Sequence, residues 1–133
     1  MAKNNPYQSY QANAVQTASP GELTLMLYNG CLKFIKQARK AIEEKNVEER
    51  NTNLLKAQKI IQELMVTLKM EYEVAKHMMT MYDYIYRRLV EANIKADASI
   101  LEEVEEYVTE FRDTWKQVIQ LNRQRQYVQG GQA

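Results

Sequence analysis

Apolar side chains recur every three or four residues along most of the chain, the spacing that places them on one face of an α-helix. Glycine and proline, the residues that most often interrupt helices, are both absent between Gly30 and Gly130. Residues that favour helices, such as Glu, Lys, Gln, Leu, Ala and Met, fill that stretch instead. The pattern therefore predicts an all-α protein.

A capping signal marks the first predicted helix, and apolar spacing marks the second. The first begins at 19–22, where a serine N-cap, a proline at the first helical position and a glutamate three residues after the cap form a start signal. We expect this helix to end near Glu44. The second should start after Asn46, because apolar residues at helical spacing resume there.

The third and fourth predicted helices are separated by a turn over 97–99. A weakly marked break near Tyr72 should start the third helix, and Ser99 with Glu102 three residues later forms the capping signal of the fourth. Four helices joined by short turns predict an antiparallel up-down four-helix bundle. We expect a mobile N-terminal arm or short cap helix over 1–18, the bundle over 19–124 and a flexible tail over 125–133.

The first predicted helix is apolar on two sides rather than one. One stripe starts at Leu23, and a second stripe on nearly the opposite side consists of Leu25, Tyr28, Leu32, Ile35 and Ile42. A helix with two apolar sides must be covered on both. We expect the second stripe to be an exposed surface that a partner can cover.

Methionine and tyrosine crowd the start of the third predicted helix, over 78–86. Met79, Tyr86 and Val90 form a stripe beside the one expected to face the core. Methionine repacks around varied partners and tyrosine gives contact area at low entropic cost, so this stripe is a second candidate contact surface. The alternative is a wide core face whose tyrosine hydroxyls reach water.

Two tyrosines, Tyr7 and Tyr10, stand in the otherwise polar N-terminal segment. They have no local apolar core to pack into. We therefore expect them to cover the exposed stripe of the first helix until a partner with similar side chains displaces them. The alternatives are that the arm is disordered or is a permanent cover.

The overall charge favours no highly charged partner. Eighteen Lys and Arg oppose seventeen Asp and Glu, which leaves a formal charge of +1 and argues against nucleic-acid binding. No apolar run approaches the roughly 20 residues that span a bilayer, and the polar start does not resemble a signal peptide. We expect a cytoplasmic protein without direct membrane insertion.

Residues that carry catalysis or bind metals are scarce. The chain has one cysteine, Cys31, and one histidine, His77, and it lacks the Glu-x-x-His pairs of di-iron bundles. Phosphate-binding and nucleophile motifs are also missing from the sequence. We therefore expect no catalytic, metal or cofactor site, and a protein that is not an enzyme.

Three segments resemble the flagellin-specific export chaperone family FliS. They are Asn5-Pro6-Tyr7-x-x-Tyr10, the run from Val15 to Leu23, and the run from Leu25 to Gly30. The match is sharpest over roughly the first 40 residues. The chain departs from the family at Asn29 and Cys31, where aspartate and alanine are usual.

The resemblance implies a cytoplasmic chaperone that binds the C-terminal region of unassembled flagellin in hydrophobic grooves. Such a protein prevents premature polymerisation and helps to deliver flagellin to a component of the flagellar type III export gate. The family's tyrosine motif maps onto Tyr7 and Tyr10, and its Leu-Met-Leu-Tyr segment onto 25–28. The expected partner-binding residues are Tyr7, Tyr10, Leu25, Tyr28, Leu32, Ile35, Met79 and Tyr86.

A different class of function is also compatible with the two-sided first helix. Its second stripe would make a permanent homodimer in a constitutively self-associating helical-bundle interaction protein. A chaperone is expected to be a monomer or at most a weak homodimer, and to form a one-to-one complex. The mass in solution separates the two.

Overall fold

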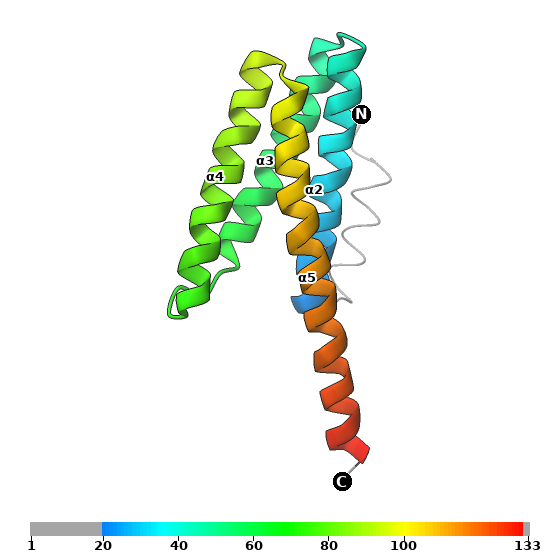
Figure 1. Ribbon diagram of the computed structural model, residues 1–133, viewed down its shortest axis with the longest axis vertical. Helices are drawn as coiled ribbons and strands as arrows, with labels where there is room; N and C mark the ends of the chain where they lie inside the picture. The colour runs from blue at the N-terminus through cyan, green and yellow to red at the C-terminus, as the bar shows by residue number, and fades with distance from the viewer. Residues whose placement is uncertain (1–19, 132–133) are drawn as a thin grey trace, which may run out of the picture.

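The computed structural model describes residues 20–131, which form four helices and the three turns between them (Figure 1). The helices are α2 (Pro20–Glu43), α3 (Val47–Val66), α4 (Glu73–Lys95) and α5 (Ala98–Gly131). Successive helices run in opposite directions, and no strand occurs among the described residues. The predicted all-α, antiparallel up-down four-helix bundle is confirmed.

The turn between α2 and α3 is short because Lys45 adopts a left-handed conformation, with φ 57°. The amide of Asn46 then donates to the carbonyl of Ala41 over 2.8 Å, which closes the end of α2. The side chain of Asn46 accepts a hydrogen bond from the amide of Glu49 over 3.1 Å. Asn46 therefore closes the last turn of α2 with its amide and caps α3 with its side chain. Helix α3 starts directly after it, as predicted.

The turn between α3 and α4 carries no glycine or proline, yet the chain does break at the predicted place. Tyr72 is the N-cap of α4 in an extended conformation, without a side-chain hydrogen bond to the helix. At the end of α3, the hydroxyl of Thr67 donates to the carbonyl of Leu64 over 2.7 Å. A side chain thus satisfies a carbonyl at the end of a helix that no glycine terminates.

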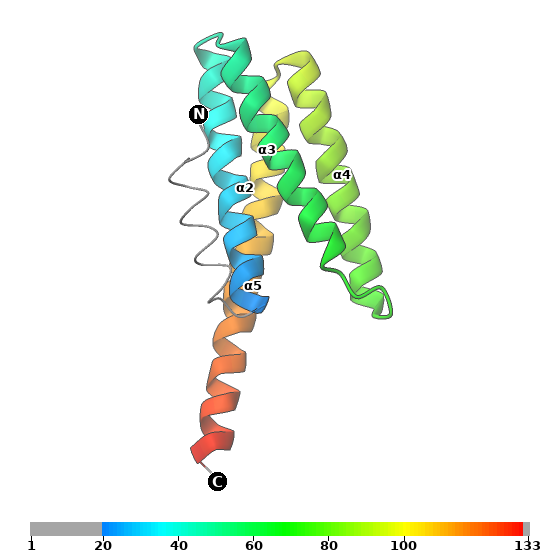
Figure 2. The ribbon, with the colours of Figure 1, turned by 180° about the vertical axis from the view of Figure 1, so that it is seen from behind.

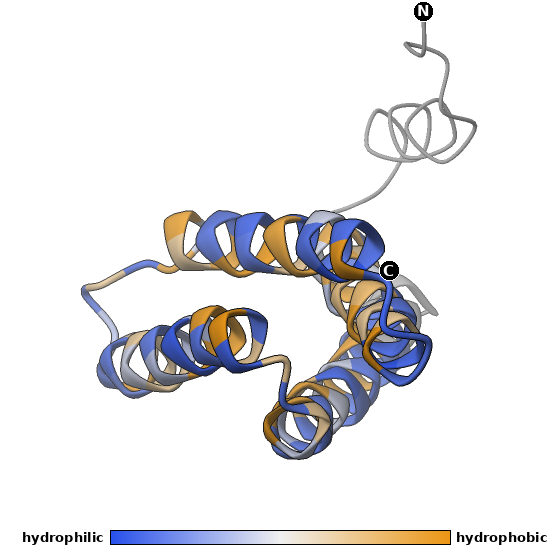
Figure 3. Cartoon of the chain, turned by 90° about the horizontal axis from the view of Figure 1, so that it is seen from above, coloured by the Kyte–Doolittle hydropathy of each residue, from blue (hydrophilic) through white to orange (hydrophobic). Residues whose placement is uncertain are grey.

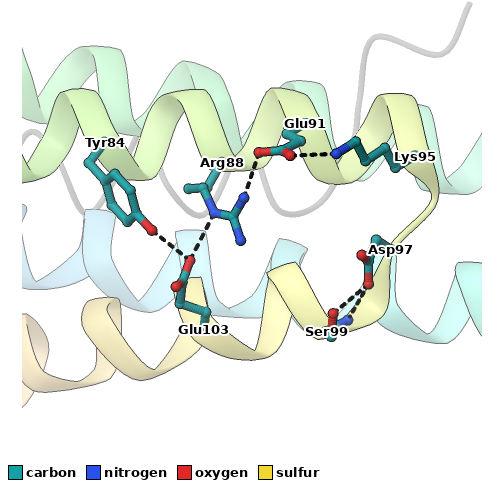
Figure 4. Close-up of polar contacts among 7 residues, drawn as sticks. All are labelled: Tyr84, Arg88, Glu91, Lys95, Asp97, Ser99 and Glu103. Carbon is teal, nitrogen blue, oxygen red and sulfur yellow. Dashed lines mark hydrogen bonds and ion pairs between the residues drawn. The ribbon is translucent and has the colours of Figure 1, made fainter.

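The cap of α5 differs from the prediction. The helix begins at Ala98, and Asp97 rather than Ser99 supplies the capping side chain. Its Oδ1 accepts from the amide of Ser99 over 2.9 Å and from the hydroxyl of Ser99 over 2.6 Å (Figure 4). Aspartate is as good an N-cap as serine and stands where the amides of the first turn converge on it.

Helix α2 packs against both α3 and α5, and the latter two each pack against α4. Seen from above, the four helices surround a common interior (Figure 3). Leu32 and Ile35 of the second stripe belong to the same buried core as residues from the other three helices. The expectation that this stripe is exposed is therefore wrong, because neighbouring helices of the bundle cover both sides of α2.

Helix α5 continues to Gly131, past residue 124 where we expected the bundle to end. Its C-terminal part projects beyond the other helices (Figures 1 and 2). Among the described residues, no helix is both long enough and apolar enough to cross a membrane.

Candidate binding groove

An open groove lies between the first turns of α4 and the middle of α5, with a volume of about 550 Å³. In Figures 1 and 2 the α3–α4 pair spreads away from α2 and α5 toward the turn that joins α3 to α4. Side chains from three helices line it: Tyr28, Val74, His77, Met78, Met81, Tyr107, Glu110, Phe111, Thr114, Trp115 and Val118.

The spacing of these residues follows directly from helical periodicity. The α4 wall uses positions 74, 77, 78 and 81, and the α5 wall uses 107, 110, 111, 114, 115 and 118. Both sets recur at intervals of three and four residues, so each wall is one continuous face of its helix. The two faces meet over Tyr28, the only lining residue that α2 contributes.

The groove is almost free of charge. Glu110 is the one acidic side chain among the described lining residues, and most of the others are aliphatic, aromatic or thioether groups. Methionines Met78 and Met81 lie on the α4 side, where their flexible side chains can adapt to a ligand. This composition fits an apolar face of a polypeptide better than a small charged metabolite.

Aromatic side chains fix Tyr28 beneath the groove. The rings of Tyr28 and Phe111 stack with centroids 6.1 Å apart, and the ring of Tyr82 lies 5.6 Å from that of Phe111. The hydroxyls of Tyr28 and Tyr82 form a hydrogen bond of 2.5 Å. Burial raises the pKa of both phenols, so both are neutral at physiological pH.

A polar network holds the other end of α4 against α5 (Figure 4). The Nε of Arg88 and the hydroxyl of Tyr84 both donate to Glu103 Oε1, over 2.9 and 3.1 Å. Arg88 also pairs with Glu91, which accepts from Lys95 as well. The bonds from Lys95 and Arg88 lower the pKa of Glu91. The network closes the interface at the end of α4 opposite the groove.

The structure places the predicted contact residues of α2 differently from our expectation. Tyr28, Leu32 and Ile35 are only 1%, 4% and 0% exposed, and they lie in the core. Leu25 is half-buried. Of these four residues, only Tyr28 borders the groove, and their role in binding stays a prediction.

The predicted contact residues of α4 lie outside the groove. Met79 and Tyr86 are both half-buried, and the hydroxyl of Tyr86 accepts a weak hydrogen bond of 3.4 Å from Gln62 of α3. Tyr86 therefore contacts α3 rather than the groove on the α5 side. The two arm residues, Tyr7 and Tyr10, lie outside the described residues.

The reasoning from sequence missed most of the groove. Phe111, Trp115 and Val118 continue the apolar spacing of α5, and all three side chains stay partly exposed. A signal was present, because this stripe extends nearly three turns past Val108, the last buried residue of α5 among the side chains that the structure describes. On α4, Val74 carries its apolar side chain in the first turn, outside the predicted contact stripe of Met79, Tyr86 and Val90.

Fold and groove together define a helical-bundle protein with an open apolar groove. The chain belongs to the FliS family, since the family model described as "Flagellar protein FliS" matches residues 3–122. The resemblance noted in the sequence is thereby confirmed.

Individual relatives agree with this assignment. The chain is 60% identical to the flagellar secretion chaperone FliS of Bacillus subtilis (strain 168) over 131 residues, covering 98% of each chain. It is 37% identical to the protein of the same name from Salmonella typhimurium, over 80% of this chain and 81% of the relative. A crystal structure of a flagellar chaperone from bacteria has the same fold, with a TM-score of 0.72 at 15% identity, over 86% of this chain and 95% of the other.

Proposed function

We propose that this chain is a cytoplasmic flagellar secretion chaperone that binds the C-terminal region of unassembled flagellin. By holding that region it prevents premature polymerisation, and it assists delivery to a component of the flagellar type III export gate. The proposal is supported by the relatives from Bacillus subtilis and Salmonella typhimurium, which carry the name flagellar secretion chaperone.

The observation that carries the proposal is the apolar groove between α4 and α5. An amphipathic helix can place its apolar face between two helices of a bundle and bury anchors at positions i, i+3, i+4 and i+7. The groove walls repeat at the same intervals, so successive turns of a bound helix would meet successive turns of α4 and α5.

Binding of this kind needs neither a nucleotide nor a covalent step. Apolar surface that leaves water contributes about 25 cal/mol per Å², and a segment that folds on binding buries on the order of 1,000–3,000 Å². The entropy lost when the client becomes ordered opposes this gain. The balance holds the client while it waits for export and still permits its release.

Within this proposal, Val74, Met81 and Trp115 are the main contacts with the client. Tyr28 contacts it from below, whereas Leu32 and Ile35 act indirectly by holding Tyr28 in place. Leu25, Met79 and Tyr86 are proposed to extend the contact outside the groove. Tyr7 and Tyr10 of the arm are proposed to compete with the client.

Calorimetric titration of a peptide covering the C-terminal helical region of flagellin tests the proposal. Val74→Glu places a charge in the groove wall at a side chain that is 65% exposed, so the fold should tolerate it. Val47→Glu is the matched control, because this valine is 61% exposed and also lies in the first turn of a helix, away from the groove. We expect one-to-one binding that Val74→Glu weakens at least tenfold and Val47→Glu leaves unchanged.

The same samples distinguish the self-associating alternative. A monomeric mass by analytical ultracentrifugation, together with one-to-one binding, supports the chaperone. A constant dimeric mass without any heat of peptide binding would instead favour a permanent homodimer.

A further inference from the structure

Two buried hydroxyl groups face each other beneath the groove, one from the lining residue Tyr28 and one from Tyr82, which lies behind it. Tyr28 is 1% exposed and Tyr82 is 2% exposed, and their hydroxyl oxygens lie 2.5 Å apart. Neither hydroxyl has another hydrogen bond within residues 20–131. Both oxygens are therefore satisfied by the same single bond.

Counting protons shows that this bond leaves one donor unused. Each phenol carries one O–H donor, and burial keeps both phenols protonated. Only one of the two protons can lie between the oxygens. The other proton has no acceptor in the described part of the chain, although a buried donor without a partner costs free energy.

Among the described residues, the groove is the open space that borders this pair of hydroxyls. Tyr28 lines it, whereas Tyr82 does not, and stacking on Phe111 holds the Tyr28 ring in position. The arrangement that serves a ligand is thus a relay in which Tyr82 donates to Tyr28. The Tyr28 proton is then directed to the occupant of the groove.

We infer that Tyr28 determines specificity by donating this hydrogen bond to a side-chain amide oxygen of Asn or Gln on the apolar face of the bound segment. The inference rests on the proposed function and names one polar requirement of the client. A backbone carbonyl is a poor acceptor, because a bound helix uses its carbonyls internally. A carboxylate of the client is also a poor acceptor, because it would lose its hydration on entering the groove and would lie near the acidic side chain of Glu110.

A double-mutant cycle tests the inference. The chaperone variants are Tyr28→Phe and Tyr82→Phe, a matched pair that removes one or the other hydroxyl from the same hydrogen bond. The ligands are the flagellin C-terminal peptide and versions in which each Asn or Gln is replaced in turn by Leu or Met. Thermal unfolding of both variants checks that they are folded to a similar extent.

We expect Tyr28→Phe to weaken binding of the unmodified peptide by about 2- to 12-fold, as for one neutral hydrogen bond. One peptide substitution should cause the same loss with the wild-type protein and no further loss with Tyr28→Phe. Tyr82→Phe should keep this sensitivity, because the Tyr28 hydroxyl is still present. Titration of the substituted peptides into the wild-type protein tests by itself whether one Asn or Gln of the client contributes to binding.

Other results would overturn it. If no amide substitution affects binding to the wild-type protein, or if its effect adds to that of Tyr28→Phe, then Tyr28 donates no such bond. In that case Val74→Glu would still weaken binding if the groove is the client site, and only this inference would fail. Absence of any peptide binding would remove both this inference and the proposed function.

Discussion

The indole N–H of Trp115 donates a hydrogen bond of 2.8 Å to the backbone carbonyl of Gly21. This bond joins the middle of α5 to the first turn of α2, 94 residues earlier in the chain. A second link lies two turns further along, where Arg123 pairs with Glu22. The long helix is thereby fixed to the start of the bundle, and its Trp115 side chain forms a firm wall of the groove.

Trp115→Phe should lower the free energy of unfolding by about 1–3 kcal/mol, because it removes the donor and part of the buried ring. Urea unfolding followed by circular dichroism measures the change. Arg123→Gln serves as the comparison and should have a much smaller effect, since both partners of its ion pair are exposed. An unchanged midpoint for Trp115→Phe would show that the bond to Gly21 contributes nothing.

Leu32→Glu should unfold the protein rather than block one surface. Its side chain is almost fully buried in the core, so the substitution buries a charge without a partner and should cost more than about 4 kcal/mol. Loss of cooperative thermal unfolding is the expected result. A folded Leu32→Glu variant that merely fails to bind the client would restore the idea of an exposed stripe on α2.

Deletion of residues 1–18 should tighten client binding if the arm only competes for the groove, because the free protein would then spend less time blocked. Calorimetry with the flagellin peptide compares the deletion variant with the Tyr7→Ala, Tyr10→Ala double variant. Both should shift affinity in the same direction. Weaker binding by the deletion variant would show instead that the arm contacts the client itself.

Cys31 should be inert in the folded protein. Its side chain is fully buried, and burial raises the pKa of the thiol to about 12, so almost no thiolate exists at pH 8. A thiol reagent such as dithionitrobenzoate should react only after denaturant is added. Rapid labelling of the native protein would reveal opening of α2 from its neighbours.

Asp97 should make stability depend on pH at the start of α5. The hydrogen bonds from Ser99 lower the pKa of this carboxylate, so its stabilising contribution is present above the pKa of the unfolded chain, near 3.9. That contribution is lost as the pH falls through the lower pKa of the folded state. Asp97→Ala should therefore be less stable than the wild type at pH 7, and the difference should shrink at lower pH.

The sequence predicted the helices well because caps and periodicity are local properties. Asn46 and Tyr72 stand where the structure begins α3 and α4. The two apolar sides of the first helix were also correctly identified. What covers those sides depends on which helices are neighbours, and local patterns do not contain that information.

The candidate site was harder to predict for the same reason. Whether Phe111 lies in a closed core or in an open groove depends on the angle at which α4 crosses α5. That angle follows from the packing of whole helices. Val74 and Met81 line the groove because α4 spreads away from α5 at its start, and no local pattern in the sequence specifies that spread.

The polar network around Arg88 and Glu103 also has a mechanical consequence. It anchors one end of α4, while Val74 lies 14 residues away, a distance of about 21 Å at 1.5 Å per residue. A difference of about 5° in the angle between α4 and α5 at this network corresponds to about 2 Å at the first turn of α4, because the displacement grows with that distance. The contacts around Arg88 and Glu103 therefore help to set the width of the groove between Val74 and α5, although they lie outside the groove.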